Sequence, residues 1–187
     1  MKTLFLIAIL YSQVAMAAPV TLEISGHITS VDFALTSYYT VDSPFTINLI
    51  YDPAEPNIGT AHLTTSGHDL FGSGPLWARN NVPFDEFTFP YVQVTGLNIP
   101  PFDIPRLSIN FVDFSSALFN NETLPDPFPQ MSQWSDVSAF LGYEDSAVSM
   151  DRRVNFHVEM VVVPEPTISW LLLIACSLLF LRRSRIA

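Results

Sequence analysis

The feature that most constrains the fold of this chain is an alternation of apolar and polar residues with a period of two. The alternation is clearest in four segments: Val20–Thr29, Phe45–Asp52, Arg106–Phe111 and Val154–Met160. Successive side chains of a strand point to opposite faces of a sheet. Each segment therefore predicts a strand with one face in a core and the other in water.

Further strands are predicted in the middle of the chain. Phe87–Val94 is a fifth strand, in which Pro90 indicates a sheet edge or a bulge. Weaker candidates are Tyr38–Val41, Ala61–Thr65, Ser116–Phe119 and Val137–Tyr143. No segment between residues 18 and 162 shows a sustained helical period.

Turn signals separate these strands. Prolines and turn dipeptides recur about every ten residues, and Gly72-Ser73-Gly74-Pro75 is expected to be a loop. Short strands with one apolar face at this spacing are typical of an antiparallel β-sandwich or jelly roll. We therefore expect an all-β fold, with one sandwich or jelly-roll-like domain over residues 18–162. The order of the strands stays open.

The first 17 residues have the features of a secretory signal peptide. A positive start at Lys2 precedes an apolar region, and Ala15-Met16-Ala17 is a small-x-small cleavage site. We expect a signal-peptide helix over residues 1–17, with cleavage between Ala17 and Ala18. The rest of the chain would then cross the inner membrane.

Residues 163–187 combine three different pieces. Val163-Pro164-Glu165-Pro166 interrupts regular structure, because proline lacks a backbone donor. An uncharged apolar run follows over Thr167–Leu181, and Arg182, Arg183 and Arg185 close the chain. As a helix this run is about 22 Å long, less than the roughly 30 Å of a bilayer core, so arginine snorkelling and local thinning would help it insert.

These residues resemble the PEP-CTERM sorting signal of Gram-negative bacteria that make extracellular polysaccharide. The resemblance implies that an exosortase, a membrane-embedded cysteine protease, cuts near Pro164-Glu165-Pro166 and passes the protein outward. The apolar run over residues 167–181 would be the transmembrane helix of the precursor, and the three arginines would stay in the cytoplasm, as the positive-inside rule requires. A plain tail anchor that is never cut is the alternative.

The first third of the domain resembles the opening of a group of PEP-CTERM ectodomains with the pattern "GxITSVD … VGDPFTGxFxYDP". The matching segments are Ile24–Asp32, Val41–Thr46 and Ile50–Pro53. The chain departs from the pattern at Asp42-Ser43, where the pattern has Gly-Asp, and at Ile47-Asn48, where glycine is common. The resemblance implies a strand, a turn and a second strand, and no activity.

Charge and cysteine content exclude several classes of protein. Four of the eight basic residues and one of the 18 acidic residues, Glu165, lie in the two end segments, which leaves four arginines against 17 acidic residues, a net charge of −13. Such a domain repels nucleic acid and anionic lipid, so no nucleic-acid partner is expected. The single cysteine, Cys176, lies in the apolar tail, so the domain has neither a disulfide nor a thiol nucleophile.

Candidate chemistry in the domain is weak. Trp77 and Trp134 could stack on sugar rings or simply complete a core. His62 and His68 with Asp69 could suggest a metal site, and Asp52, Glu55 and Asn57 a calcium-binding turn; their spacing favours solvated side chains and an ordinary turn. Carboxylates that could pair for glycoside hydrolysis are Asp85, Glu86, Asp103, Glu144 and Asp145.

The sequence thus predicts an exported, non-enzymatic protein without catalytic residues, metal or cofactor. It would be a single-pass precursor in the inner membrane and, after processing, a protein of the cell surface or exopolysaccharide matrix. A carbohydrate-binding module, an exported hydrolase and a permanently anchored protein are the alternatives.

Overall fold

The computed structural model describes residues 19–54, 58–81, 84–102, 104–119, 121–145 and 150–163. These residues form nine strands and two short 3-10 helices. The strands are β1 Val20–Val31, β2 Pro44–Tyr51, β3 Ile58–Thr65, β4 His68–Pro75, β5 Trp77–Asn81, β6 Phe84–Thr95, β7 Arg106–Asp113, β8 Asp136–Asp145 and β9 Met150–Val162. The 3-10 helices are η1 Phe33–Leu35 and η2 Met131–Gln133.

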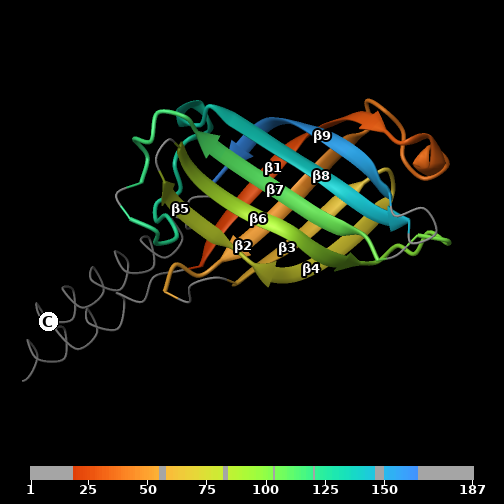
Figure 1. Ribbon diagram of the computed structural model, residues 1–187, viewed down its shortest axis with the longest axis horizontal. Helices are drawn as coiled ribbons and strands as arrows, with labels where there is room; N and C mark the ends of the chain where they lie inside the picture. Colours follow the sequence, from red (N-terminus) through yellow and green to blue (C-terminus); the bar gives the residue numbers. More distant parts are fainter. Residues whose placement is uncertain are drawn as a thin grey trace, which may run out of the picture.

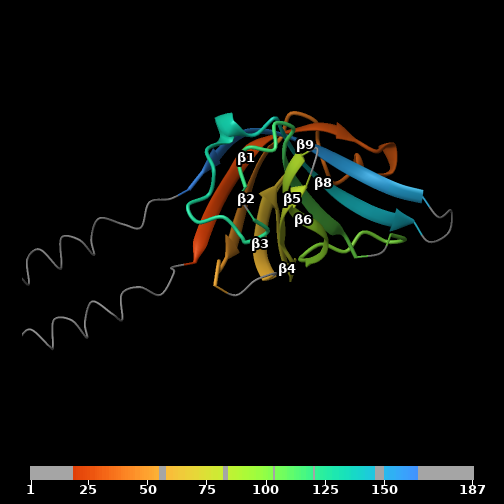
Figure 2. The same ribbon diagram turned by 60° about the vertical axis from the view of Figure 1, so that its left-hand side comes forward.

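The strands form one antiparallel sheet that closes on itself (Figures 1 and 2). Their order is β4-β3-β2-β1-β9-β8-β7-β6-β5, and a further pairing of β4 with β6 joins the two sides. Eight strands therefore form a closed barrel in which neighbours along the chain are neighbours in the sheet, and β5 extends β4 alongside β6.

The prediction of an all-β antiparallel fold is confirmed, and the prediction of a sandwich or jelly roll is wrong. A sandwich packs two sheets face to face, whereas here a single sheet curls until its edges pair. Both arrangements give strands with one buried face, so the alternation along the sequence is the same for the two.

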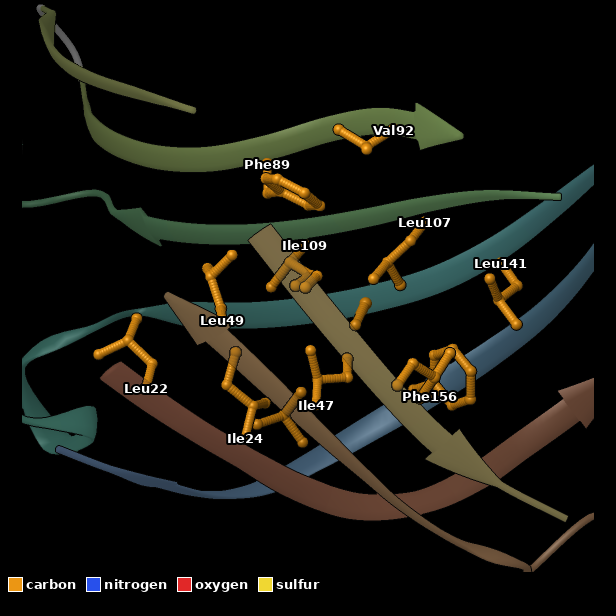
Figure 3. Packing of buried hydrophobic residues seen from close by; sticks show 14 of the residues in the cluster. Leu22, Ile24, Ile47, Leu49, Phe89, Val92, Leu107, Ile109, Leu141 and Phe156 are labelled. Carbon is orange, nitrogen blue, oxygen red and sulfur yellow. The ribbon is translucent and has the colours of Figure 1, made fainter. Parts of the chain in front are cut away.

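The interior of the barrel is filled by the apolar side of every long strand. Figure 3 shows side chains from β1, β2, β6, β7, β8 and β9 pointing toward one another. Those fully shielded from solvent include Leu22, Ile24, Ile47, Leu49, Phe89, Leu107, Ile109 and Leu141. An eight-stranded barrel is just narrow enough for side chains to fill it, which explains why these residues are large.

The seam between β4 and β6 depends on two glycines. A Cβ atom on Gly72 would lie 2.7 Å from Cγ1 of Val94, and one on Gly74 would lie 2.7 Å from Cγ2 of Val92. Both positions face inward, because they alternate with exposed Phe71 and Ser73. The prediction that residues 72–75 form a loop is therefore wrong: the glycines belong to a strand whose missing side chains let β6 approach.

Of three other predictions for the strands, one is confirmed and two are wrong. The predicted bulge at Pro90 is confirmed, since the register of β6 against β7 shifts between Phe89 and Val92. Tyr38–Val41 and Ser116–Phe119 are not strands. Tyr39 and Phe119 are buried in connections that cover the barrel, and the Tyr39 hydroxyl lies 2.5 Å from that of Tyr143.

The strand, turn and second strand expected from the ectodomain pattern correspond to β1 and β2, which pair antiparallel. Asp42, which stands where that pattern has glycine, has a φ of 66°. This left-handed conformation is the one that favours glycine, and aspartate tolerates it better than most residues.

The beginning of β1 and the end of β9 lie at the same end of the barrel (Figure 1). The two strands pair there, with Glu23 opposite Val162. The η1 helix lies at the opposite end. The segments before Pro19 and after Val163 are therefore joined to one end of the barrel.

Candidate functional site

Trp134 lies in the core, and its predicted role in sugar stacking is wrong. Only 7% of the surface of Trp134 is exposed to solvent. Its ring packs against Phe111, Phe119 and Phe128, with centroids 5.3, 5.6 and 5.6 Å away. These contacts cover the indole, so the alternative role of completing a core applies.

Trp77 lies on the outer face of β5 and does not share a platform with Trp134. The guanidinium carbon of Arg79 lies 4.8 Å from the centroid of the Trp77 ring, a cation–π contact. Arg79 also faces Glu86, with 3.8 Å between Nη1 and Oε2. The arginine therefore occupies one face of the indole, and the two tryptophans do not form a joint sugar-binding surface.

His62 and His68 lie on opposite faces of the sheet. His62 is on the outer face, where its Nε2 lies 3.2 Å from Oδ1 of Asp69. The ring of His68 instead contacts Tyr39 edge-on and faces the Tyr38 carbonyl oxygen at 3.2 Å. Among the described residues no group of three or more histidine, cysteine, aspartate or glutamate side chains could hold a metal ion.

The described candidate carboxylates do not converge. Asp85 faces the interior and is fully buried, whereas its neighbour Glu86 faces outward beside Arg79. Glu144 pairs with Arg106 on another part of the sheet, with 3.2 Å between Oε2 and Nη2. Asp103 and the side chain of Asp145 lie outside the described part. The described carboxylates are thus not arranged as a glycosidase pair.

Asp85 and Asp113 hold the long connection between β7 and β8. They stand opposite each other in the register of β6 and β7. Oδ2 of Asp85 accepts hydrogen bonds from the backbone N–H groups of Leu118 and Phe119, both at 2.9 Å. The hydroxyl of Ser115 lowers the pKa of Asp113 to about 2, with help from nearby backbone N–H groups and against the opposing effect of burial. These acids fix a loop, which is a structural role.

The predicted turn at Asp52 forms through its own side chain. Oδ1 of Asp52 accepts a hydrogen bond from the backbone N–H of Ala54 at 2.8 Å, as in an Asx turn. Glu55 and Asn57, the other two candidates for a calcium site, lie outside the described residues.

A groove crosses the outer face of four strands, β2, β3, β4 and β6. It has a volume of about 590 Å³. The side chains that line it are Asn48, Ile50, Thr60, His62, Phe71, Ser73, Gln93 and Thr95. The register places Asn48, His62, Phe71 and Thr95 in one row across these strands. The groove therefore combines an aromatic surface with amides and hydroxyls.

The aromatic part of the groove is a stacked pair. The rings of His62 and Phe71 lie 4.1 Å apart at an angle of 10°. Asp69 fixes His62, and its Oδ1 also accepts a hydrogen bond from the Thr64 hydroxyl at 2.9 Å. The Thr64 hydroxyl and the His62 ring lower the pKa of Asp69, so this carboxylate stays ionised and keeps the pair in place.

Sequence reasoning missed this groove, although a signal was present. His62 and Thr60 alternate with buried residues on β3, as Phe71 and Ser73 alternate with inward positions on β4. The second alternation was not recognised, because Gly72 and Gly74 occupy the inward positions of β4 and a Gly-Ser-Gly-Pro sequence is typical of a loop. The row exists only once β4 pairs with both β3 and β6.

The terminal predictions lie almost wholly outside the described residues. This holds for Ala15, Ala17, Ala18, Pro164, Glu165, Pro166, Arg182, Arg183 and Arg185, and for the apolar run over residues 167–181. Val163 is described; it is exposed and directly follows β9. Within the part of the chain that the structure describes, no helix has both the length and the apolar character needed to cross a membrane.

No protein-family model matches this chain, no curated protein is significantly similar to it, and no solved structure matches it at a significant level.

Proposed function

We propose that this chain is an exported, non-enzymatic protein that an exosortase-type membrane protease processes near Pro164-Glu165-Pro166. As a precursor it is held in the inner membrane by residues 167–181, and after the cut it is released to the cell surface or polysaccharide matrix. The observation that carries the proposal is the order of its last residues: a Pro-Glu-Pro motif, an uncharged apolar run and an arginine cluster.

The position of the motif relative to the barrel supports this proposal. The last residue of β9 that pairs with β1 is Val162, so only Val163 separates the sheet from Pro164. Proline cannot donate to a sheet ladder, which favours an end to the strand at this point. A cut at the motif would leave every described strand intact.

The common end of β1 and β9 supports the same topology. A chain led across the membrane by its first residues and held by its last ones has both segments on the membrane side. β1 begins where β9 ends, and η1 lies at the opposite end of the barrel. In the proposed precursor the first of these ends would face the bilayer. No rearrangement of the barrel is needed on release.

Mass spectrometry of the protein from its native host tests the proposal. We expect an intact mass and C-terminal peptides of a chain that starts near Ala18 and ends near Pro164–Pro166, in the fraction outside the inner membrane. A chain in the inner membrane that keeps residues 167–187 would instead identify a permanent anchor and overturn the sorting function.

Substitution of the arginine cluster provides a second test of the proposal. Replacement of Arg182, Arg183 and Arg185 by glutamine removes the charges that hold the tail in the cytoplasm, and we expect impaired retention and a larger inverted or unprocessed fraction. Replacement of Arg152 and Arg153 by glutamine is the matched control, because these residues lie in the barrel. Unchanged topology and processing in the triple variant would contradict the role of the cluster.

A further inference from the structure

The aromatic side chain at the centre of the outer groove has no role in the core. Phe71 is 52% exposed, while its neighbour Leu70 is fully buried inside the barrel. A second large apolar residue, Ile50, is exposed in the same groove. Exposed apolar surface that is gathered in a groove with polar residues around it marks a binding site more often than a scattered surface residue does.

The platform formed by Phe71 is held in place before any ligand arrives. His62 stacks on one face of its ring, and the Asp69–Thr64 network fixes His62 in turn. A side chain whose ring is already packed against a neighbour loses less conformational entropy when a ligand stacks on it. Phe71 is also one of the residues that line the groove.

Polar side chains that both donate and accept hydrogen bonds lie on two sides of this platform. Asn48 stands on β2, and Gln93 stands on β6. Thr60 and Ser73, opposite each other on β3 and β4, add two hydroxyls. Amides and hydroxyls that bind in both directions match the hydroxyl groups of a sugar, which also donate and accept.

Charge decides which sugars fit. The side chains that line the groove include no aspartate, glutamate, lysine or arginine, and its one histidine, His62, is paired with Asp69. The domain around it has a net charge of −13, which repels polyanions. A protein partner with an apolar surface fits less well, because it would strip water from the amides and hydroxyls without replacing their hydrogen bonds.

We propose that the groove over β2, β3, β4 and β6 binds a neutral oligosaccharide, which stacks on Phe71 and forms hydrogen bonds with Asn48 and Gln93. This site is separate from Trp77 and Trp134. The proposal of sugar binding depends on the groove and not on processing at the C-terminus, so each of the two proposals can be tested independently of the other.

Titration of the purified full-length chain with sugars tests the proposal. The protein is kept in a zwitterionic detergent, since a detergent with a sugar headgroup would compete for the groove. The probes are neutral hexamers of glucose, galactose and mannose units, with a hexamer of uronic acid units as the anionic comparison. Calorimetry or intrinsic fluorescence measures the dissociation constant. We expect saturable binding of at least one neutral hexamer and weaker or no binding of the anionic one.

Variants locate the binding. Phe71→Ala is expected to weaken the affinity about tenfold or more, because it removes the stacking surface. Asn48→Ala is expected to weaken the affinity less. The matched control is Phe33→Ala on η1, which removes a 90% exposed phenylalanine at the far end of the barrel and leaves the affinity unchanged. Equal melting temperatures of the variants show that the barrel is intact, as the outward position of Phe71 leads us to expect.

Three results would overturn the site: no neutral hexamer binds, the anionic hexamer binds more tightly, or Phe71→Ala binds as the parent chain does. Processing at the C-terminus is read separately by mass spectrometry in cells. A protein that is cut and released but binds no sugar disproves only the groove, and one that binds sugar but keeps its tail disproves only the sorting function.

Discussion

Asp113 shows how a single side chain acts on the stability of this protein. It is 2% exposed, and its carboxylate accepts hydrogen bonds from the hydroxyls of Ser115 and Ser135 and from the backbone N–H of Ala117. These donors favour the charged form and lower the pKa of Asp113 from 3.8 to about 2. The acid thereby anchors the chain that follows β7.

The depressed pKa of Asp113 predicts a loss of stability in acid. Because the folded pKa lies below the unfolded one, this contribution is complete above about pH 4 and is lost as the pH falls toward 2. In Asp113→Asn we expect a lower melting temperature at pH 6 and a smaller drop in melting temperature between pH 5 and pH 2.5. Thermal unfolding by circular dichroism at several pH values measures both.

Ser115→Ala provides a graded comparison for Asp113→Asn. It removes the donor with the largest effect on the Asp113 pKa but keeps the carboxylate. Its folded pKa moves back toward 3.8, so we expect an acid-dependent loss that begins at the same pH as in the parent chain but is smaller. An unchanged acid-induced drop in Asp113→Asn would show that other groups cause the acid sensitivity.

At the scale of the element, strand β4 can pair with β6 because two of its residues have no side chain. It carries Gly72 and Gly74 on its inner face, opposite the valines of β6. Glycine ordinarily weakens a strand, since it adds backbone entropy to the unfolded chain and packs no side chain. In this strand that cost is offset by the approach of β6, which closes the barrel and leaves β4 and β6 without a free edge at the seam.

The seam predicts a coupled pair of substitutions. Gly74→Ala places a methyl group 2.7 Å from Cγ2 of Val92, and we expect it to reduce the free energy of unfolding by about 1–3 kcal/mol. Val92→Ala also destabilises, because it leaves a cavity. In the double variant the two effects should be less than additive, since the smaller residue makes room for the new methyl group.

Chemical denaturation of the parent, both single variants and the double variant gives the coupling free energy. Gly67→Ala is a useful comparison, because a Cβ atom there meets nothing within 4 Å and only the positive φ of 78° opposes it. Strictly additive effects at residues 74 and 92 would mean that the seam does not depend on this contact.

At the scale of the whole molecule, closure makes the barrel nearly independent of where the chain starts. The first and last strands pair as all the other neighbours do, with Glu23 opposite Val162. Proteins whose ends lie close together at the surface usually tolerate circular permutation. Which strand comes first in the chain is therefore expected to matter little to the sheet.

A permuted chain tests this independence. Pro19 and Val163 are joined by a flexible linker of about six glycine and serine residues, and the chain is opened between Ser66 and Gly67 in the β3–β4 hairpin. We expect the native near-ultraviolet spectrum and cooperative unfolding. A control opened between Ile109 and Asn110, inside β7, should fail to fold. Failure of the Ser66–Gly67 permutant would show that the order of synthesis matters for closure.

Most of the strands could be predicted from the sequence, because the burial of one face leaves a local trace in every second residue. The bulge at Pro90 could also be predicted, since a residue without an N–H cannot continue the ladder. Strand β4 could not be predicted, because two of its inward positions are glycines and the alternation of apolar and polar side chains is therefore missing.

For the candidate site, the sequence suggested the type of ligand but not the residues that would bind it. The sequence suggested aromatic stacking on a sugar, but it pointed to Trp77 and Trp134 rather than to Phe71. Trp134 is buried under the connection after β7, and Arg79 covers a face of Trp77. The burial of Trp134 has no local signature, because it depends on the path of that connection. The contact between Arg79 and Trp77 lies within β5, a strand that the sequence did not indicate.

The sequence by itself determined most of the strands and their buried faces, the acidic character of the domain and the composition of the two end segments. These are properties of single residues and of neighbours along the chain. Only the tertiary structure decided that the sheet closes, that Gly72 and Gly74 form its seam, and that Asn48, His62, Phe71 and Thr95 share a row. Closure and rows arise from pairing between distant strands, and a period of two is the same whichever strand lies alongside.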